Sequence, residues 1–152
     1  MGKRLPKPLR PSGPGPWRQV AALPWRRRGG RLEVCLVTTR ETRRWTVPKG
    51  WPMKGISDRR AAAVEAEEEA GLRGKAAADP LGTYTYWKRG TARFDLVHVA
   101  VYPLEVRRGL DEWKERGERE VRWMSISDAR IVVDEPELVS LLGRFAENFE
   151  KP

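Results

Sequence analysis

Residues 49–72 join a glycine-containing loop to a short acidic helix that ends at a glycine. The loop contains two glycines and a proline, and Ser57 or Asp58 is a suitable N-cap for the helix that follows. Gly71 stands where a left-handed C-cap belongs, with an apolar residue directly after it. We therefore predict a helix over residues 58–70, with a loop on its N-terminal side.

Four glutamates crowd one and a half turns of this helix. Glu65, Glu68 and Glu69 are related by three and four residues, so their carboxylates lie on one helix face and repel one another. A hard divalent cation would relieve this repulsion, because Mg²⁺ prefers oxygen ligands. The alternative is a solvated acidic face whose charge is balanced by three nearby arginines, namely Arg59, Arg60 and Arg73.

The spacing of this segment resembles the signature of the Nudix hydrolase superfamily. That signature begins with a glycine, passes through a pair of glutamates in its helix, and closes on a glycine and an apolar residue. The positions that match it are Gly50, Glu65, Glu68, Glu69, Gly71 and Leu72, with Ala66 in the apolar slot. The residues that lead into it also resemble those of diphosphoinositol-polyphosphate and diadenosine-polyphosphate hydrolases, namely Arg40, Trp45, Val47, Pro48 and Lys49.

Two signature positions depart from the family pattern. Ile56 stands where the first glutamate belongs, and Val64 stands where an arginine helps to orient the carboxylates. Removing one partner of a buried ion pair costs about 3–5 kcal/mol, whereas replacing both partners with apolar residues is often neutral. We therefore expect the fold to be retained. The two outcomes for function are a hydrolase with reduced activity and a descendant that only binds its ligand.

The resemblance implies a cofactor, Mg²⁺ or Mn²⁺, held by Glu65, Glu68 and Glu69 with the backbone carbonyl of Gly50. In this scheme Glu68 is either a metal ligand or the general base that activates the attacking water. The other source of a base is an acidic loop, which carries Asp111, Glu112, Glu115 and Glu118.

Three basic residues near the signature are candidates for binding substrate phosphates, namely Arg18, Arg40 and Lys49. The fork of an arginine side chain matches phosphate oxygens. Trp51, in the glycine loop, is a further candidate for substrate contact. The alternative for each cation is an ordinary surface charge, and for Trp51 it is packing over the loop.

The basic charge is concentrated at the N-terminus. The chain has 30 Lys and Arg against 21 Asp and Glu, a net charge of +9. Residues 1–31 hold nine basic side chains and no acid, so the remainder is formally neutral. We predict that residues 1–16, with five prolines and three glycines, form a disordered or loosely draped tail, and that residues 17–152 form a single domain. The tail either attracts a polyanion or serves solubility.

Several classes of protein are excluded or disfavoured. No apolar stretch approaches the roughly 18 residues of a membrane span, and the N-terminus lacks the apolar region of a secretory signal. A single cysteine, Cys35, cannot form an internal disulfide. We therefore expect a cytoplasmic protein without a membrane partner.

The remaining elements alternate between strands and helices. Strands are predicted over residues 17–25, 32–39, 45–48, 81–88, 93–104 and 119–124. Helices are predicted over residues 127–132 and 135–149, the second with a core-facing stripe of leucine and phenylalanine. Pro24 indicates that the first strand lies at an edge or ends there, and residues 105–118 are expected to form the charged loop.

These observations and the resemblance together predict the α/β class, with a Nudix-type α/β/α sandwich and a mixed sheet. The resemblance implies hydrolysis of a diphosphate linkage in a nucleoside- or inositol-linked phosphorylated small molecule. The first alternative is a catalytically weakened module that binds phosphorylated ligands or RNA. The second is a basic nucleic-acid-binding domain, which rests on the charged tail alone and has no motif to support it. The sequence sets no oligomeric state.

Overall fold

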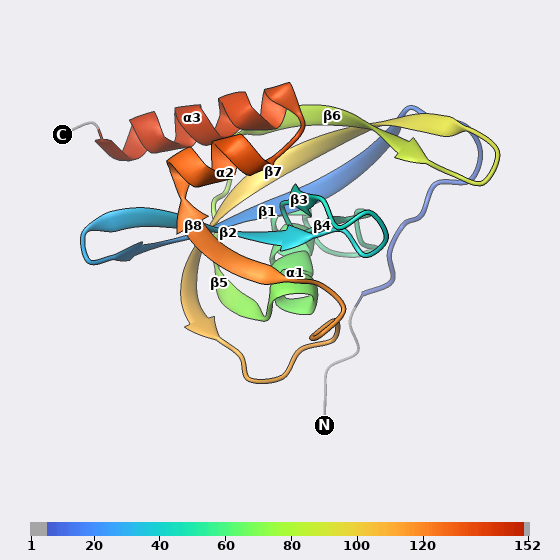
Figure 1. The fold of residues 1–152 in the computed structure, drawn as a ribbon. Helices are drawn as coiled ribbons and strands as arrows, with labels where there is room; N and C mark the ends of the chain where they lie inside the picture. Colours follow the sequence, from blue (N-terminus) through green and yellow to red (C-terminus); the bar gives the residue numbers. More distant parts are fainter. Residues whose placement is uncertain (1–5, 151–152) are drawn as a thin grey trace.

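A computed structural model describes residues 6–150 and shows a mixed sheet between two helical layers (Figure 1). The strands are β1 (Trp17–Arg28), β2 (Arg31–Thr38), β3 (Trp45–Thr46), β4 (Lys49–Gly50), β5 (Leu72–Ala76), β6 (Gly82–Arg89), β7 (Phe94–Gly109) and β8 (Val121–Ser125). The helices are α1 (Asp58–Ala70), α2 (Ile126–Val132) and α3 (Pro136–Glu150). This arrangement is the α/β/α sandwich that the sequence predicts.

Two long strands, β1 and β7, form the parallel centre of the sheet. β2 pairs antiparallel with β1, and it also pairs antiparallel with β3 and with β8. The first part of β7 pairs with β6 and its last part pairs with β5, both antiparallel. The short β4 pairs with β1 beside Val20 and Ala21, and so brings the glycine loop to the middle of the molecule.

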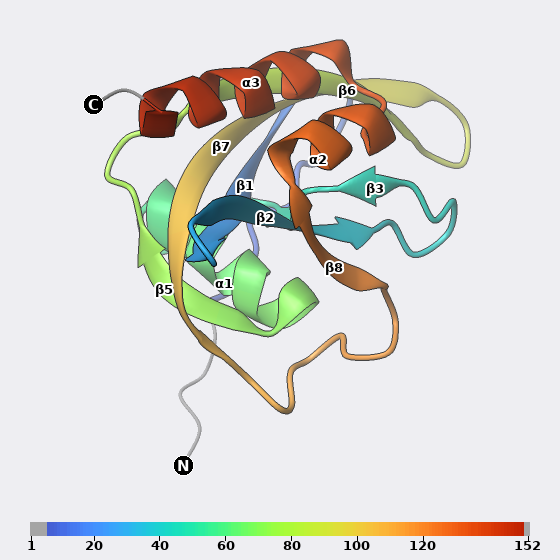
Figure 2. The same cartoon turned by 60° about the vertical axis from the view of Figure 1, so that its left-hand side comes forward.

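Each face of the sheet has its own apolar cluster, because successive residues of β1 point to opposite sides. Val20 and Ala22 face α1, whereas Ala21 and Leu23 face α2 and α3. Figure 2 shows α1 on one side of the sheet and the two C-terminal helices on the other. The predicted stripe on α3 enters the second cluster through Leu138, Leu141, Leu142 and Phe145.

Helix α1 begins and ends where the sequence predicts. The Ser57 hydroxyl accepts the backbone N–H of Arg60, which satisfies one free donor of the first turn. Gly71 adopts a left-handed conformation at φ 68°, and its N–H donates to the carbonyls of the last turn. A side chain at position 71 would also collide with the ring of Trp113. Both the backbone conformation and this close contact therefore favour glycine.

Several predicted boundaries are wrong, for identifiable reasons. β7 continues to Gly109, because its charged end pairs with β5, so the expected loop over residues 105–118 begins only after that strand. β4 and β5 are not predicted at all. β4 has only two residues, and β5 carries Arg, Gly and Lys between its buried ends, which gives no apolar alternation. Both β4 and β5 form because they pair with longer strands, and not because their own residues favour the strand conformation.

The expectation for Pro24 is also wrong, because β1 is a central strand. On one side of β1 the antiparallel ladders involve Val20–Ala21 with β4 and Trp25–Arg28 with β2. Pro24 falls between these ladders, so the sheet needs no N–H from it on that side. β1 also continues to Arg28, beyond the predicted end at residue 25, and the turn to β2 consists of Gly29 and Gly30, both with positive φ.

Part of the predicted N-terminal tail is in contact with the domain. The N–H of Lys54 donates to the carbonyl of Lys7 at 3.0 Å, and the N–H of Leu9 donates to Pro52 at 2.7 Å. The N–H of Gly15 donates to the Asp95 carboxylate at 3.1 Å. These bonds fit a draped segment. Residues 1–5 lie outside the described residues, so their expected disorder stays a prediction. Across residues 6–150, none of the helices has the length and apolar character to span a membrane.

Candidate active site

The carboxylates of Glu65 and Glu69 meet between α1 and the glycine loop. Small residues on the inner face of α1, such as Ala62 and Ala66, are fully buried and allow the helix to lie close to the sheet. This approach presses Glu65 against Gly50, where any Cβ would overlap the carboxylate. A side chain at position 50 would displace the Glu65 carboxylate, and the Gly50 backbone lies directly beside that carboxylate.

Burial raises the pKa of both carboxyl groups, and at Glu65 the neighbouring carboxylates raise it further. For Glu65, desolvation is the largest cause, followed by the charges of Glu69 and Glu68. For Glu69, desolvation also dominates and is opposed by the positive charges of Arg119 and Lys49. The two groups hydrogen-bond to each other, which requires a shared proton. Without a proton or a cation between them, this pair would be strongly unfavourable.

The third signature glutamate, Glu68, points to a different partner. It is 8% exposed, and its carboxylate lies 2.9 Å from the Lys114 ammonium. Helix spacing thus places all three glutamates near one another, but the structure brings only Glu65 and Glu69 into contact. As the side chains stand, no group of three or more His, Cys, Asp or Glu within residues 6–150 is arranged to hold a metal ion.

The chemistry of the buried pair nevertheless fits a hard divalent cation. Glu65 and Glu69 offer oxygen donors, which Mg²⁺ and Mn²⁺ prefer. The raised pKa values reflect chiefly the burial of these carboxyl groups, so their ionised forms need a compensating charge. A cation could replace the shared proton there, and Glu68 could join once it leaves Lys114. The fit rests on these donors and on the close approach at Gly50.

A loop after β7, residues 110–120, covers the C-terminal end of α1 and supplies charged partners. The Arg119 side chain is 12% exposed and reaches both Glu115, at 3.0 Å, and Glu69, at 3.7 Å. Sequence patterns did not single out Arg119 or Lys114, because each stands among many other charged residues of the same loop. The topology places them next to α1, and no local signal indicates it.

The four acidic residues of the predicted loop separate into one inward residue and three outward ones. Glu115 is 13% exposed and faces Arg119. Glu112 pairs with Arg116 on the surface, Glu118 pairs with Arg40, and Asp111 is exposed. Of this set, Glu115 alone lies near the Glu65 and Glu69 pair.

The basic substrate-binding candidates differ in position. Lys49 lies closest to the acidic pair, since its backbone N–H donates to Glu69 at 3.3 Å. Burial lowers the pKa of the Lys49 ammonium, and the charge of Glu69 opposes that change. Arg40 is exposed and lies 3.3 Å from Glu118. Arg18 is exposed and pairs with Asp58 at the other end of α1.

Trp51 and the two departures from the signature occupy apolar surroundings. The Trp51 ring packs edge-on against Trp17, with ring centres 5.7 Å apart, and the Lys88 ammonium lies 6.0 Å from it. Ile56 and Val64 both pack against the apolar cluster beneath α1. Neither residue therefore leaves a charge without a partner.

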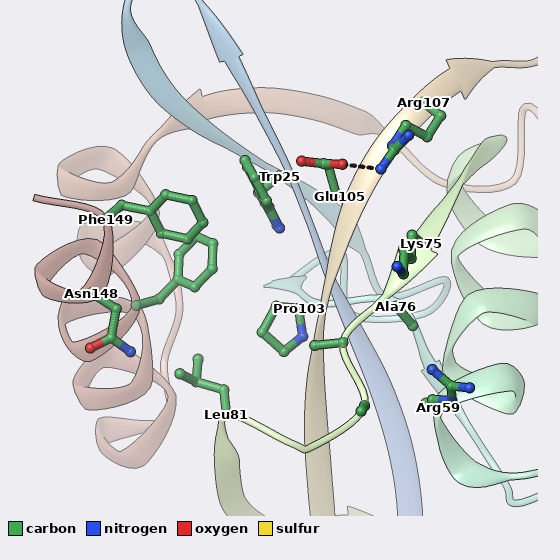
Figure 3. A pocket seen from close by; sticks show the side chains of 13 residues that line it. Trp25, Arg59, Lys75, Ala76, Leu81, Pro103, Glu105, Arg107, Asn148 and Phe149 are labelled. Atoms are coloured by element: carbon green, nitrogen blue, oxygen red, sulfur yellow. Dashed lines mark ion pairs between the residues drawn. The ribbon is translucent and has the colours of Figure 1, made fainter.

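A hollow of the described chain lies elsewhere, between the end of α3 and β5 (Figure 3). Its volume is about 630 Å³. Trp25 and Phe149 line one side, whereas Arg59 and Lys75 line the other, and the one carboxylate drawn in Figure 3, Glu105, is paired with Arg107. The hollow contains none of the signature glutamates. Its one carboxylate is paired and none of the signature glutamates reaches it, so the candidate active site is the carboxylate pair.

Comparison with known proteins places this geometry in a family. The model of the NUDIX domain matches residues 15–147. Two curated relatives from Arabidopsis thaliana, Nudix hydrolase 12 and Nudix hydrolase 13, both named as mitochondrial, are 30% identical over 103 and 105 residues. The match covers 65% of this chain in each case, and the chain spans about half the length of these relatives. The cytoplasmic location expected for this chain stays a prediction.

Solved structures share the fold at lower identity. An Ap4A hydrolase from C. elegans, in a binary complex, is 22% identical with a TM-score of 0.66, covering 88% of this chain and 97% of that one. A MutT protein from Methanosarcina mazei Go1 is 20% identical with a TM-score of 0.63, covering 89% and 96%. At this identity the likeness shows the fold alone.

Proposed function

We propose that this chain, which belongs to the NUDIX domain family, hydrolyses a diphosphate linkage in a nucleoside- or inositol-linked phosphorylated small molecule. We propose further that it does so with Mg²⁺ or Mn²⁺. The observation that carries the proposal is the buried pair of carboxylates, Glu65 and Glu69, closed against the backbone of Gly50. The Nudix hydrolase names of the two plant relatives support the same reaction class.

The charge of a diphosphate explains why this arrangement suits its hydrolysis. The diphosphate oxygens are already negative and repel an incoming nucleophile, so catalysis needs positive charge and a positioned water. A bound divalent cation would neutralise the charge on these oxygens and act as a Lewis acid. Glu65 and Glu69 are the residues that would hold it, with the carbonyl of Gly50 beside them. Glu69 is buried and Glu65 is partly buried, so both carboxylates are already enclosed between α1 and the glycine loop.

Two carboxylates can accept the proton of the attacking water. Glu68 lies on the same helix as the pair, but it must first leave the Lys114 ammonium. Glu115 lies on the covering loop, is largely buried, and is held by Arg119. We propose Glu68 as the base or as a third ligand, and Glu115 as the base if Glu68 binds the cation.

Lys49 is the phosphate-binding residue that the geometry favours, because it lies beside Glu69 on the strand that carries Gly50. Arg40 lies at the rim of the same site, where its contacts to Glu115 and Glu118 can give way to a phosphate. Arg18 and Trp51 lie toward the N-terminal end of α1 and can contact a more distant part of the substrate.

One observation favours the second candidate function, a module that binds phosphorylated ligands with weak or no turnover. The Glu68–Lys114 ion pair occupies a carboxylate that catalysis would use. The same measurement separates the two functions, because only the enzyme releases product.

The experiment is a panel of nucleoside- and inositol-linked diphosphates, incubated with the purified protein and Mg²⁺, Mn²⁺ or EDTA. We expect product with at least one divalent cation and none with EDTA. Glu65→Gln should abolish turnover. Glu67→Gln is the matched control, because Glu67 lies on the same helix but pairs with Arg73 on the outer face. It should retain activity. Turnover that persists in EDTA would contradict the metal requirement. Ligand binding without turnover would establish the second function.

A further inference from the structure

Arg119 is a largely buried cation beside the carboxylate pair, and each part of its guanidinium has a partner. Its Nε donates to Glu115 Oε1 at 3.0 Å, and one Nη donates to the carbonyl of Thr38 at 3.0 Å. The other Nη lies 3.7 Å from Glu69 Oε2. One planar group thus connects α1, the end of β2 and the covering loop.

The backbone on both sides of this group is fixed. The N–H of Thr38 donates to the carbonyl of Glu120 at 3.1 Å, and the N–H of Glu120 donates to the Thr38 hydroxyl at 2.9 Å. The N–H of Glu115 donates to the carbonyl of Glu68 at 3.0 Å, which ties the loop to α1. These hydrogen bonds hold the backbone around Arg119 in place, and its side chain points inward from there.

Helix α1 supplies no cation of its own to orient Glu69. Its last turn holds no basic residue, and Val64 on the preceding turn is apolar. The remaining positive partner of Glu69 is the backbone N–H and ammonium of Lys49. When both carboxylates are ionised they repel each other, and without an external restraint they would turn apart.

We infer that Arg119 is a positioning residue, which holds the carboxylates of Glu69 and Glu115 in one orientation and so aligns the helix and loop contributions to the reaction. This inference rests on the proposed function. An arginine fork can bond to two acceptors at fixed angles, whereas a lysine ammonium cannot impose that geometry. In this role Arg119 acts through the carboxylates that it holds.

The test compares Arg119→Gln, Arg119→Lys and the control Arg116→Gln in the full chain. Arg116 carries the same charge on the same loop, but it is exposed and pairs with Glu112. We expect Arg119→Gln to lower kcat by about 10²-fold with little change in KM, because misplacement of about 1 Å has effects of this size. Arg119→Lys should fall between wild type and Arg119→Gln. Arg116→Gln should match wild type.

A second readout separates positioning from site assembly. Mn²⁺ should raise the melting temperature of Arg119→Gln at least as much as that of wild type, since a competing positive charge has been removed. Loss of both Mn²⁺ stabilisation and turnover would overturn the inference, because Arg119 would then be needed to build the site. Wild-type kcat in Arg119→Gln, or in Arg119→Lys, would overturn it as well.

A crystal structure of Arg119→Gln makes the inference testable independently of turnover. We expect the carboxylates of Glu69 and Glu115 to move apart or take more than one conformation. Unchanged positions for both would refute the positioning role even if no substrate is known. A wild-type protein that hydrolyses no compound on the panel would instead refute the proposed function.

Discussion

The two helical layers cover the same sheet with side chains of different size. Helix α1 contributes small buried residues, namely Ala61, Ala62, Ala66 and Ala70. Helix α3 contributes large ones, namely Leu138, Leu141, Leu142 and Phe145. Alanine lets α1 lie close to the strands and brings Glu65 into contact with Gly50. The large residues of α3 fill the opposite cluster, which holds most of the buried apolar side chains.

This difference separates chemistry from stability. The α1 face carries two buried carboxylates that destabilise the protein unless a proton or a cation compensates them. The α3 face carries apolar contacts that stabilise the fold. The hollow of Figure 3 lies beside the end of α3 and contains none of the signature glutamates. Substitutions on the two faces should therefore have opposite effects on turnover and on the free energy of unfolding.

The largest expected effect is the loss of turnover in Glu69→Gln. The change preserves volume and removes a charge from the buried pair, so we expect turnover to fall by about 10²–10³-fold, the range seen when one preorganised electrostatic contact is removed. The melting temperature without divalent cation should be no lower than that of wild type, because repulsion within α1 is relieved. Added Mn²⁺ should stabilise the variant less than wild type.

Thermal unfolding with and without Mn²⁺, together with the hydrolysis assay, checks this prediction. Glu67→Gln serves again as the control on the outer face of α1. Equal Mn²⁺ stabilisation and equal activity in Glu69→Gln and wild type would show that Glu69 belongs to no cation site.

The opposite pattern is expected for Leu142→Ala on α3. Leu142 is fully buried in the cluster that α3 shares with the sheet. Its truncation should lower the free energy of unfolding by about 3 kcal/mol, within the range for buried leucines. Turnover per folded molecule should be unchanged. Urea denaturation and an assay below the melting temperature measure the two quantities. A loss of turnover in the folded variant would show that the faces are coupled.

Sequence patterns predict the α1 face well, because its signals are local. The caps at Ser57 and Gly71 and the spacing of Glu65, Glu68 and Glu69 all lie within one short segment, and the helix bounds follow directly. The same holds for the apolar spacing on α3. Strands β4 and β5 could not be predicted this way, because their pairing with β1 and β7 is distant in sequence.

The partners of the carboxylates were harder to predict than the carboxylates themselves. Arg119 and Lys114 approach α1 only because the loop after β7 folds back over the helix. Helical spacing alone also suggested that Glu68 converges with Glu65 and Glu69, whereas Lys114 draws it aside. Contacts between segments distant in the chain leave no periodic pattern in the sequence.

A smaller effect is expected where the signature has lost its charges. Val64→Arg would place a guanidinium at the edge of the apolar cluster beneath α1, where Arg59, Arg60 and Arg73 already lie around Val64. We expect a loss of about 1 kcal/mol in the free energy of unfolding. The loss should be smaller when Ile56→Glu supplies a partner, since both residues border the same apolar cluster. A double-mutant cycle by urea denaturation measures this coupling. Additive effects of the two substitutions would refute the pairing.

The smallest effect concerns a carboxylate on the α3 face. The hydroxyl and N–H of Thr85 both donate to Glu137, and these bonds hold the pKa of that carboxyl below its usual range. A depressed pKa means that the ionised form stabilises the folded state. The contribution is therefore fully present above the unfolded pKa of about 4.3, and it is lost as the pH falls through the folded value.

Glu137→Gln should be less stable than wild type at neutral pH, and the two should converge in acid. Glu147→Gln, an exposed acid on the same helix with no ion pair in the described chain, should show no such convergence. Thermal unfolding across this pH range decides the matter, and a stability gap for Glu137→Gln that stays constant into acid would contradict the assigned bonds.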